Sequence, residues 1–265
     1  MVNVDTLWAP LFVPANRPER FEKAARSGAD AVILDLEDAV APEAKDAARV
    51  ALRTDFTDLP VIVRINPAGT PWHEDDLAAL RTLPVAAIML PKAESGAALD
   101  RVAADFTGHT PIIALVETAR GIADARAIAA TENVVRLAFG SVDYCADLGC
   151  AHLREVLLPA RCEVVLASRL AGIAAPIDGV TTALDDLSIT ASDTQHARAL
   201  GMTGKLCIHP KQIAEVMRNF APAPEELDWA RRVLEAGDGA VSVDGAMVDE
   251  PVRIKARALM ARSGA

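Results

Sequence analysis

The 265-residue sequence predicts an α/β fold, a TIM (β/α)8 barrel followed by a short C-terminal helical arm. Three observations support this prediction. Short apolar segments alternate with helix-like segments almost throughout the chain, and eight such apolar segments can be counted, the number that this barrel requires. Most of them are apolar without interruption, as is typical of parallel strands buried on both faces. The chain length also suits one barrel of this kind.

The predicted strands are short and rich in Val, Ile, Leu and Ala. Polar or charged residues follow nearly all of them, at the point where each strand would end. The eight strands cover Leu7–Val13, Ala31–Leu36, Val61–Ile65, Ala86–Leu90, Ile112–Val116, Val135–Phe139, Ala175–Asp178 and Lys205–Ile208.

Predicted helices separate the strands. The first has Pro18 at a favoured first helical position and ends at Gly28. Helices are predicted over Pro18–Ser27, Pro42–Arg53, His73–Thr82, Ser95–Asp105, Gly121–Thr131, His152–Gly172, Ser192–Leu200, Lys211–Phe220 and Pro224–Ala236, and the last segment, Val241–Ala261, contains a turn at Asp244 and Gly245 before its helix.

The Ala-Pro-Ala-Pro sequence at 221–224 marks the best candidate for a domain boundary. We therefore expect a catalytic barrel over 1–220 and a helical arm over 221–265. A doubly wound open sheet would also alternate strands with helices. It is disfavoured because no GxGxxG turn follows any early strand.

Composition excludes several classes of function. The chain has 27 basic and 37 acidic residues and a net charge of −10, a poor basis for binding the phosphates of nucleic acid. The four cysteines form no CxxC pair, no apolar run reaches the length of a membrane span, and no basic segment precedes an apolar one at the N-terminus. We expect a cytoplasmic protein without nucleic-acid or membrane partners.

Two acidic residues follow successive strands, Glu117 and Asp143. Because adjacent strands of a barrel end side by side, their carboxylates should lie close together and repel unless a cation is present. Oxygen ligands with little His or Cys favour a hard ion such as Mg²⁺. The alternatives are a general acid/base pair or two solvated loop carboxylates.

Arg64 ends a Val-Ile-Val strand and should point into the mouth of the barrel. A guanidinium there suits a carboxylate or the developing oxyanion of an enolate. The alternative is a structural ion pair with Glu37 or Asp38, and both roles can coexist. At least one of Asp35, Glu37 and Asp38 is expected to support Arg64 or metal-bound water.

Basic residues also stand near strand ends. Arg17, Arg20 and Lys23 begin the first helix, a suitable place for phosphate, although a solvated helix face explains them equally well. Lys92, after the fourth strand, has the same two interpretations. His209 is interpreted as a structural histidine.

The motifs of this chain resemble a known family, the citrate lyase β-subunit-like (CitE-like) branch of the HpcH/HpaI aldolase/citrate lyase superfamily, near the malyl-CoA and citramalyl-CoA lyases. The resemblance extends from about residue 7 to residue 260. The segments that carry it are LFVPANRPERF (11–21), ILDLEDAV (33–40), VRINPAGTPW (63–72), IMLPKAES (88–95), ALVETARGI (114–122), LAFGSVDYCADLG (137–149), AAPIDGV (174–180) and GKLCIHPKQI (204–213).

The resemblance implies a TIM barrel that acts on acyl thioesters, usually as a homotrimer. It implies that Glu117 and Asp143 bind Mg²⁺, with Mn²⁺ as a possible substitute, and that Glu117 and Arg64 also contact the substrate. The loop that contains Phe12, Pro14 and Arg17 and the Ile177–Asp178 turn would line the site for the thioester and coenzyme A.

A C-terminal Gly-x-Met-x-Asp segment also matches the family and reads Gly245 to Asp249 here. By this likeness, the arm contacts a neighbouring subunit, and Asp249 exchanges a proton with the thioester α-carbon there. One position departs from the family, because Val142 replaces the acidic residue that many relatives have before the metal-binding Asp.

The expected activity is therefore Mg²⁺-dependent cleavage or formation of a β-hydroxyacyl-CoA, such as malyl-CoA or citramalyl-CoA, with an acyl-CoA and a 2-keto acid as the other partners. Alternatives are a citrate lyase β subunit that converts a citryl thioester of an acyl carrier protein to oxaloacetate, and a malyl-CoA-type thioesterase. A non-catalytic protein that binds acyl-CoA or a dicarboxylate is a further alternative.

Overall fold

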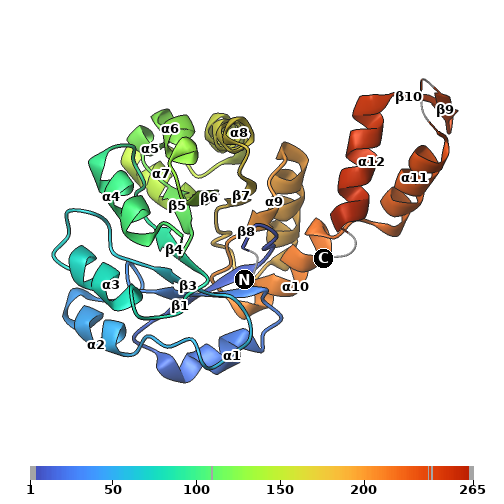
Figure 1. The fold of residues 1–265 in the computed structure, drawn as a ribbon. Coiled ribbons are helices and arrows are strands. Elements are labelled where there is room, and N and C mark those ends of the chain that lie inside the picture. Colours follow the sequence, from blue (N-terminus) through green and yellow to red (C-terminus); the bar gives the residue numbers. More distant parts are fainter. Residues whose placement is uncertain (1–3, 109, 238, 240, 263–265) are drawn as a thin grey trace. The chain divides into compact units, whose positions relative to one another are not determined.

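A computed structural model describes residues 4–262 apart from 109, 238 and 240 (Figure 1). Eight parallel strands form one sheet in the order in which they occur along the chain. They are β1 (Pro10–Pro14), β2 (Ala31–Asp35), β3 (Val61–Arg64), β4 (Ala87–Leu90), β5 (Ile112–Val116), β6 (Val134–Phe139), β7 (Ala174–Asp178) and β8 (Gly204–Lys205).

The sheet closes on itself beyond β8. Leu11 of β1 forms a parallel bridge with Cys207, and the N–H of Phe12 donates to the carbonyl of Cys207 at 2.9 Å. With helices outside the strands, this arrangement confirms the predicted TIM-barrel fold (Figure 1).

Alternate side chains of the strands fill the barrel interior. Ile33, Ile62, Met89 and Ile113 belong to one buried cluster to which seven of the eight strands or the segments beside them contribute, and each has no exposed surface. Their neighbours on the same strands pack outward against the helices, which is why these segments are apolar throughout. A rigid core of this kind fixes the strand ends, where the polar residues lie.

The helices follow the predicted pattern with some differences in extent. They are η1 (Pro18–Arg20), α1 (Phe21–Ala25), η2 (Pro42–Ala44), α2 (Lys45–Val50), α3 (His73–Leu80), α4 (Ala97–Phe106), α5 (Ala119–Ala123), α6 (Ala125–Ala130), α7 (Ser141–Leu148), α8 (Arg154–Ala171), α9 (Leu187–Leu200), α10 (Pro210–Phe220), α11 (Pro224–Glu235) and α12 (Glu250–Arg262).

One of these helices, α7, has no counterpart among the predicted elements. It begins directly after β6 and ends at Gly149, which adopts the left-handed conformation with φ of 68°. Glycine adopts that conformation without steric cost and commonly ends helices. The strand-to-helix junction at Gly140 places Asp143 in the first turn of α7.

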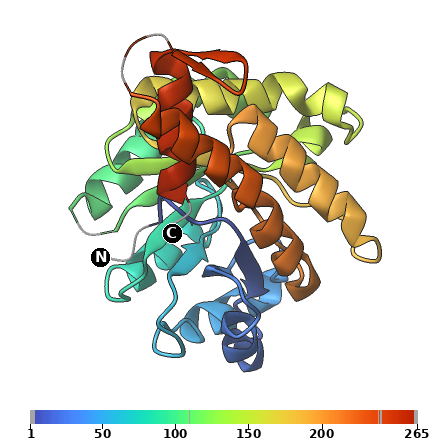
Figure 2. The same ribbon diagram turned by 90° about the vertical axis from the view of Figure 1, so that its right-hand side faces the viewer.

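The chain divides into two compact units, Met1–Val216 and Met217–Ala265. Within the second unit, α11 and α12 lie side by side, as Figures 1 and 2 both show, and Ala230, Val233, Val248, Ala256 and Leu259 form a small core of their own. The strands β9 (Val241–Val243) and β10 (Ala246–Val248) form an antiparallel hairpin before α12.

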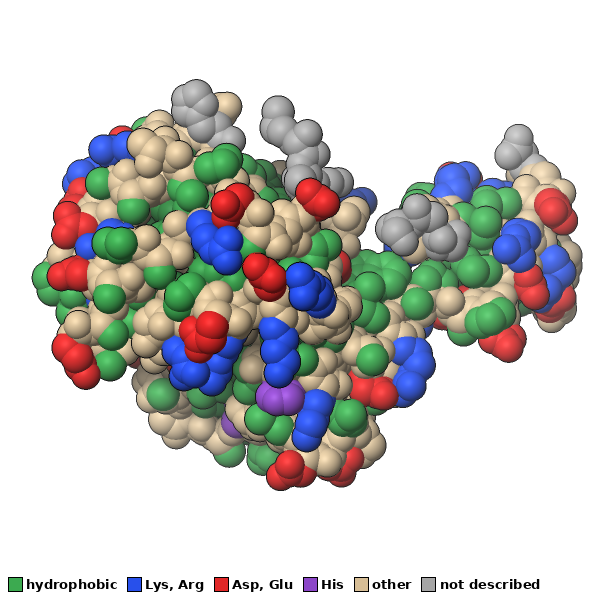
Figure 3. All heavy atoms as spheres, turned by 90° about the horizontal axis from the view of Figure 1, so that it is seen from below, with side chains coloured by type: hydrophobic (Ala, Val, Ile, Leu, Met, Phe, Trp, Pro, Cys, Tyr) green, Lys and Arg blue, Asp and Glu red, His purple; other side chains and the backbone are tan. Residues whose placement is uncertain are grey.

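The surface carries charges of both signs. On the face in Figure 3, Lys and Arg side chains are interspersed with Asp and Glu side chains. Within the described part of the chain, no helix has both the length and the apolar character needed to cross a membrane.

Candidate active site

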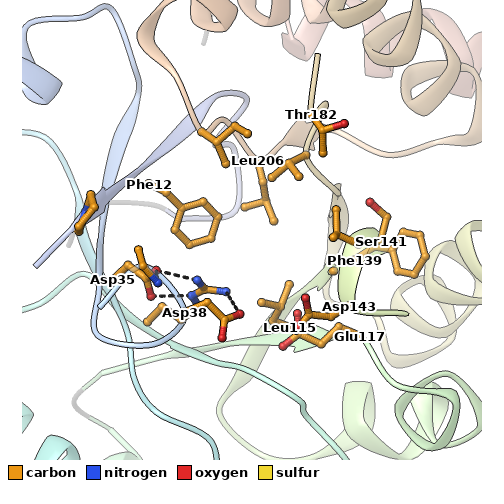
Figure 4. Close-up of a pocket in the computed structure, with 17 residues that line it drawn as sticks. Phe12, Asp35, Asp38, Leu115, Glu117, Phe139, Ser141, Asp143, Thr182 and Leu206 are labelled. Atoms are coloured by element: carbon orange, nitrogen blue, oxygen red, sulfur yellow. Dashed lines mark hydrogen bonds and ion pairs between the residues drawn. The ribbon is translucent and has the colours of Figure 1, made fainter. Parts of the chain in front are cut away.

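A cavity of about 450 Å³ opens at the carboxyl ends of the barrel strands (Figure 4). Its polar lining consists of Asp35, Asp38, Arg64, Glu117, Ser141, Asp143 and Thr182, and its apolar lining includes Phe12, Pro14, Leu115, Phe139 and Ile208. Ligand sites of TIM barrels lie at this end. The lining has the mixture that small-molecule sites have, with a few converging polar groups on an apolar wall.

Arg64, at the end of β3, is held in a fixed orientation by the neighbouring strand. Its Nε donates to Asp35 Oδ1 at 2.7 Å and its Nη2 donates to Asp35 Oδ2 at 2.6 Å, a bidentate pair across the β2–β3 register. Glu37 Oε2 lies 2.9 Å from Nη1. The structural ion pair that we considered as an alternative is therefore present, and Arg64 also lines the cavity.

Phe12 covers one face of the guanidinium, whose Cζ lies 4.7 Å from the ring centroid. Burial alone would lower the pKa of Arg64, but the carboxylates of Asp35 and Glu37 raise it well above its ordinary value. Arg64 thus stays charged and rigid, and two of its N–H groups donate to Asp35 while Nη1 forms an ion pair with Glu37. Since a guanidinium has about five N–H groups, donors remain on Nη1 and Nη2 for a ligand oxygen.

Glu117 follows β5 and has only 2% of its surface exposed. Burial and the nearby carboxylates of Glu37 and Asp143 raise its pKa to about 8, although the backbone N–H and the ammonium of Lys92 act in the opposite direction. Its side chain packs directly against Gly140, because a Cβ atom there would lie 2.2 Å from Glu117 Oε2. A glycine at the start of α7 is what makes room for this carboxylate.

Asp143 lies in the first turn of α7, and 34% of its side chain is exposed. In Figure 4, its carboxylate and that of Glu117 are on the side of the cavity opposite Asp35 and Phe12. The ammonium of Lys92 lies close to both of these carboxylates and to that of Glu37. Its Nζ lies 3.0 Å from Asp143 Oδ2, 2.7 Å from Glu37 Oε1 and 3.9 Å from Glu117 Oε1.

The charges of the site fit a divalent cation. The carboxylates of Asp35, Glu37, Asp38, Glu117 and Asp143 outnumber the cations of Arg64 and Lys92 by three when all are ionised. In the part of the chain that the structure describes, no three acidic, His or Cys side chains form a metal cluster. Two carboxylates at the cavity, those of Glu117 and Asp143, suit Mg²⁺, which usually takes its remaining oxygens from water and substrate.

The structure thus brings together most of the predicted site residues: Phe12, Pro14, Asp38, Arg64, Glu117 and Asp143 line the cavity, and Glu37 contacts Arg64 and Lys92.

Four predicted residues are not among those that line this cavity. Arg17 is exposed and donates from Nε to Glu19 at 2.6 Å. The side chains of Ile177 and Asp178, which we expected at the thioester site, have no exposed surface. Ile177 packs in the barrel interior, and Asp178 faces the helix α8 on the outer side of the sheet. Asp178 is paired there with Arg161 and Lys205. Asp249 belongs to the second unit, where its Oδ1 accepts from the N–H of Val252 at 3.4 Å at the start of α12.

Some functional contacts were not predictable from the sequence. Lys92 was interpreted as a phosphate ligand or a solvated residue, yet it contacts three carboxylates. His152, which had no usable context, lies 2.9 Å from the hydroxyl of Ser141 in the cavity wall. For Lys92 the sequence offered a partial signal, its position two residues beyond β4 and beside β5, the strand that Glu117 follows.

Comparison with known proteins places the chain in a family. The family model HpcH/HpaI aldolase/citrate lyase matches residues 9–210. A citrate lyase subunit beta-like protein of Deinococcus radiodurans is 41% identical over 94% of this chain and 95% of its own length. A (3S)-malyl-CoA thioesterase of Cereibacter sphaeroides is 33% identical over 96% of this chain and 94% of its own.

A solved structure is also similar over the full chain. The CitE protein of Mycobacterium tuberculosis, crystallised with magnesium, acetoacetate and coenzyme A, has a TM-score of 0.87 and 40% identity, and the match covers 99% of this chain and 100% of that one. The fold, the motifs and these matches lead to one conclusion: this chain belongs to the HpcH/HpaI aldolase/citrate lyase family, in its citrate lyase β-subunit-like branch.

Proposed function

We propose that the protein is a Mg²⁺-dependent carbon–carbon lyase that cleaves a β-hydroxyacyl-CoA, such as malyl-CoA or citramalyl-CoA, to an acyl-CoA and a 2-keto acid, or forms it in reverse. The observation that carries this proposal is the convergence of Glu117, Asp143 and the fixed guanidinium of Arg64 on one cavity. The similar CitE protein holds magnesium and coenzyme A, which supports the choice of cofactor and thioester.

Glu117 and Asp143 would hold the ion. When bound, Mg²⁺ supplies Lewis-acid chemistry, which polarises the hydroxyl and carboxylate oxygens of the substrate and lowers the hydroxyl pKa. The protein side chains provide the rest. Glu117 positions the reacting end of the substrate from the buried wall, and the apolar lining around Phe12 and Leu115 limits access of water.

Arg64 would donate hydrogen bonds to the oxyanion that develops during the reaction. The hydroxyl proton passes to water in the cavity, and as the bond between the hydroxyl carbon and the α-carbon breaks, the electron pair of that bond moves onto the thioester as an enolate. The free N–H groups of Arg64 would stabilise that charge, and Asp35 keeps them oriented before the reaction begins.

Asp249 would complete the reaction from a neighbouring subunit of a homotrimer. A carboxyl group there donates a proton to the α-carbon in the cleavage direction and removes it in the condensation direction. The resemblance to the family supports this role, together with the placement of Asp249 beside a hairpin in the small C-terminal unit.

The test is a coupled assay for keto acid released from malyl-CoA and citramalyl-CoA, with Mg²⁺ and with EDTA. We expect release only with Mg²⁺, and Glu117→Gln and Asp143→Asn should lower kcat/KM by about 100-fold or more. Asp100→Asn, on the exposed side of α4, changes the charge equally and serves as the control. Full Mg²⁺-dependent activity in Asp143→Asn would remove the metal assignment.

A second candidate is hydrolysis of the thioester, favoured by the 33% identity to the Cereibacter thioesterase. Release of free thiol and malate without keto acid would establish it. A third outcome, activity only with a thioester of acyl carrier protein, would identify a citrate lyase β subunit, and co-purification of that carrier would support it.

A further inference from the structure

Lys92 contacts the acidic site in two ways. Its backbone N–H donates to Glu117 Oε1 at 2.8 Å, while its Nζ donates to Glu37 Oε1 at 2.7 Å and to Asp143 Oδ2 at 3.0 Å. One residue thereby touches three carboxylates that come from the ends of β2, β5 and β6. Among the residues that the structure describes, Lys92 is the cation that forms ion pairs with both proposed metal ligands.

The backbone of Lys92 is held in an unusual conformation. Its φ is 47°, in the left-handed region that residues with a Cβ atom rarely adopt. Such conformations persist only where surrounding contacts hold them, and they concentrate at functional sites. Here the conformation lets the N–H group of Lys92 face Glu117 while its ammonium faces Glu37 and Asp143 in the same acidic cluster.

The ammonium also has room to leave. Lys92 borders two further cavities of about 440 and 390 Å³, and 38% of its side chain is exposed. It is absent from the lining of the main cavity. Its Nζ can therefore move away from Asp143 without repacking of the barrel core.

We propose that the ammonium of Lys92 is the resident counter-ion of this site, which neutralises Glu37 and Asp143 before a divalent cation binds and competes with that cation for Asp143. The inference rests on the proposed binding of metal by Glu117 and Asp143. A cation held by those two carboxylates lies near the position that Nζ occupies, 3.0 Å from one and 3.9 Å from the other. Two like charges repel strongly at such separations.

Because of this competition, tight binding of the metal should depend on the substrate. The carboxylates alone would bind the metal weakly, because each ion that enters must displace or approach a positive charge. Oxygens of the substrate would then be needed for tight binding, so that metal and substrate bind cooperatively.

The test is a titration of the metal-free protein with Mn²⁺ alone, with free Mn²⁺ measured by electron paramagnetic resonance. Lys92→Met should bind Mn²⁺ about tenfold more tightly than the wild type, since removing two ion pairs and one repulsive charge favours the metal. Lys92→Arg should stay close to the wild type. Lys23→Met, on the exposed side of α1, changes the net charge equally and should leave the affinity unchanged.

A thermal scan provides a second measurement. Without metal, Lys92→Met should melt at a lower temperature than the wild type, because three acidic groups lose their counter-ion, and saturating Mn²⁺ should restore more stability to the variant than to the wild type.

Equal or weaker Mn²⁺ binding by Lys92→Met would overturn the inference. Misfolding cannot imitate the expected result, because it weakens binding. The Asp143→Asn variant separates the two proposals. If Mn²⁺ binding does not depend on Asp143, the metal site itself is refuted. If binding depends on Asp143 but is not strengthened in Lys92→Met, only the role of Lys92 fails.

Discussion

At the scale of single residues, the site depends on side chains that are oriented before any ligand arrives. Arg64 is fixed by the bidentate pair with Asp35 and by the ring of Phe12. Because those contacts restrict the guanidinium, little conformational entropy remains to be lost when a substrate oxygen binds. The geometry of the planar fork should therefore matter as much as its charge.

Arg64→Lys tests this geometry. A lysine keeps the positive charge but cannot form two parallel hydrogen bonds to Asp35. We expect kcat/KM for keto acid release to fall by about 100-fold, with the fold intact by circular dichroism. Arg169→Lys, at an exposed position in the last turn of α8, is the matched control. Nearly unchanged activity in Arg64→Lys would show that charge alone suffices.

Asp178 supports the barrel through a buried charge network. Burial would raise its pKa, but Lys205 and Arg161 more than offset that effect, and the pKa lies below its usual value of 3.8. The ionised form therefore stabilises the fold above that pH, and its contribution disappears as the pH falls through the lower folded pKa.

Asp178→Asn should leave Arg161 and Lys205 without their buried counter-ion. The expected loss is about 3–5 kcal/mol of unfolding free energy near neutral pH, with a smaller difference from the wild type in acid. Urea unfolding at several pH values measures this. A difference that stays constant down to strongly acidic pH would contradict the assignment.

At the scale of elements, two neighbouring units of strand and helix bring the proposed metal ligands together. Glu117 follows β5, and Asp143 lies one helical turn beyond β6. Gly140 allows the two units to pack closely, since the absence of a side chain there leaves the space that the Glu117 carboxylate occupies. The junction of β6 and α7 thus determines both the position of Asp143 and the room for its partner.

Gly140→Ala should displace Glu117 and lower the affinity for Mn²⁺ by about tenfold. Gly204→Ala is the control, because a Cβ atom there would lie 2.5 Å from the carbonyl oxygen of Leu7, at the opposite end of β8 from the site. Both variants should melt at lower temperatures. If Gly204→Ala lowered the Mn²⁺ affinity equally, general loss of stability would explain the effect.

The strands were more predictable from sequence than the helices. The continuous apolar runs located all eight strands, and Ile112–Val116 was predicted with its observed bounds. The sequence did not reveal α7, because Gly140 before it has no side chain to cap a helix. The eight residues of α7 are also too few to show a long helical pattern. A helix predicted over Gly121–Thr131 is divided into α5 and α6 at Asp124.

The part of the site whose charged residues come at or just after the ends of strands was predictable from the sequence. Arg64, Glu117 and Asp143 each follow an apolar run directly, so that barrel topology alone brings them together. The same reasoning failed for the Asp178 side chain, whose partner Arg161 comes from α8, a contact that no local pattern reveals. The bridging contacts of Lys92 depend on a positive φ, which the sequence does not indicate for a lysine.

At the scale of the whole molecule, a complete active site would need residues of more than one subunit. Asp249 is assigned to the site of a neighbour, so that each active site of the expected homotrimer would combine Glu117 of one chain with Asp249 of another. Inactive variants of the two residues should then complement each other.

Glu117→Gln and Asp249→Asn chains, each inactive alone, should regain activity when they are co-expressed and co-purified. In an equal mixture, about a quarter of the sites would contain both intact residues, because each comes from a different subunit of a closed ring. Recovery near that level in the keto acid assay is the expected result. Oligomers that contain both chains but stay inactive would show that Asp249 does not serve a neighbouring site.

The central claim is that the site cleaves a carbon–carbon bond and not the thioester. The most direct measurement is the product balance from malyl-CoA with Mg²⁺, followed by nuclear magnetic resonance in a single reaction. A carbon–carbon lyase would give glyoxylate and acetyl-CoA in equal amounts, and neither product with EDTA. Malate and free coenzyme A without glyoxylate would contradict that claim and establish a thioesterase.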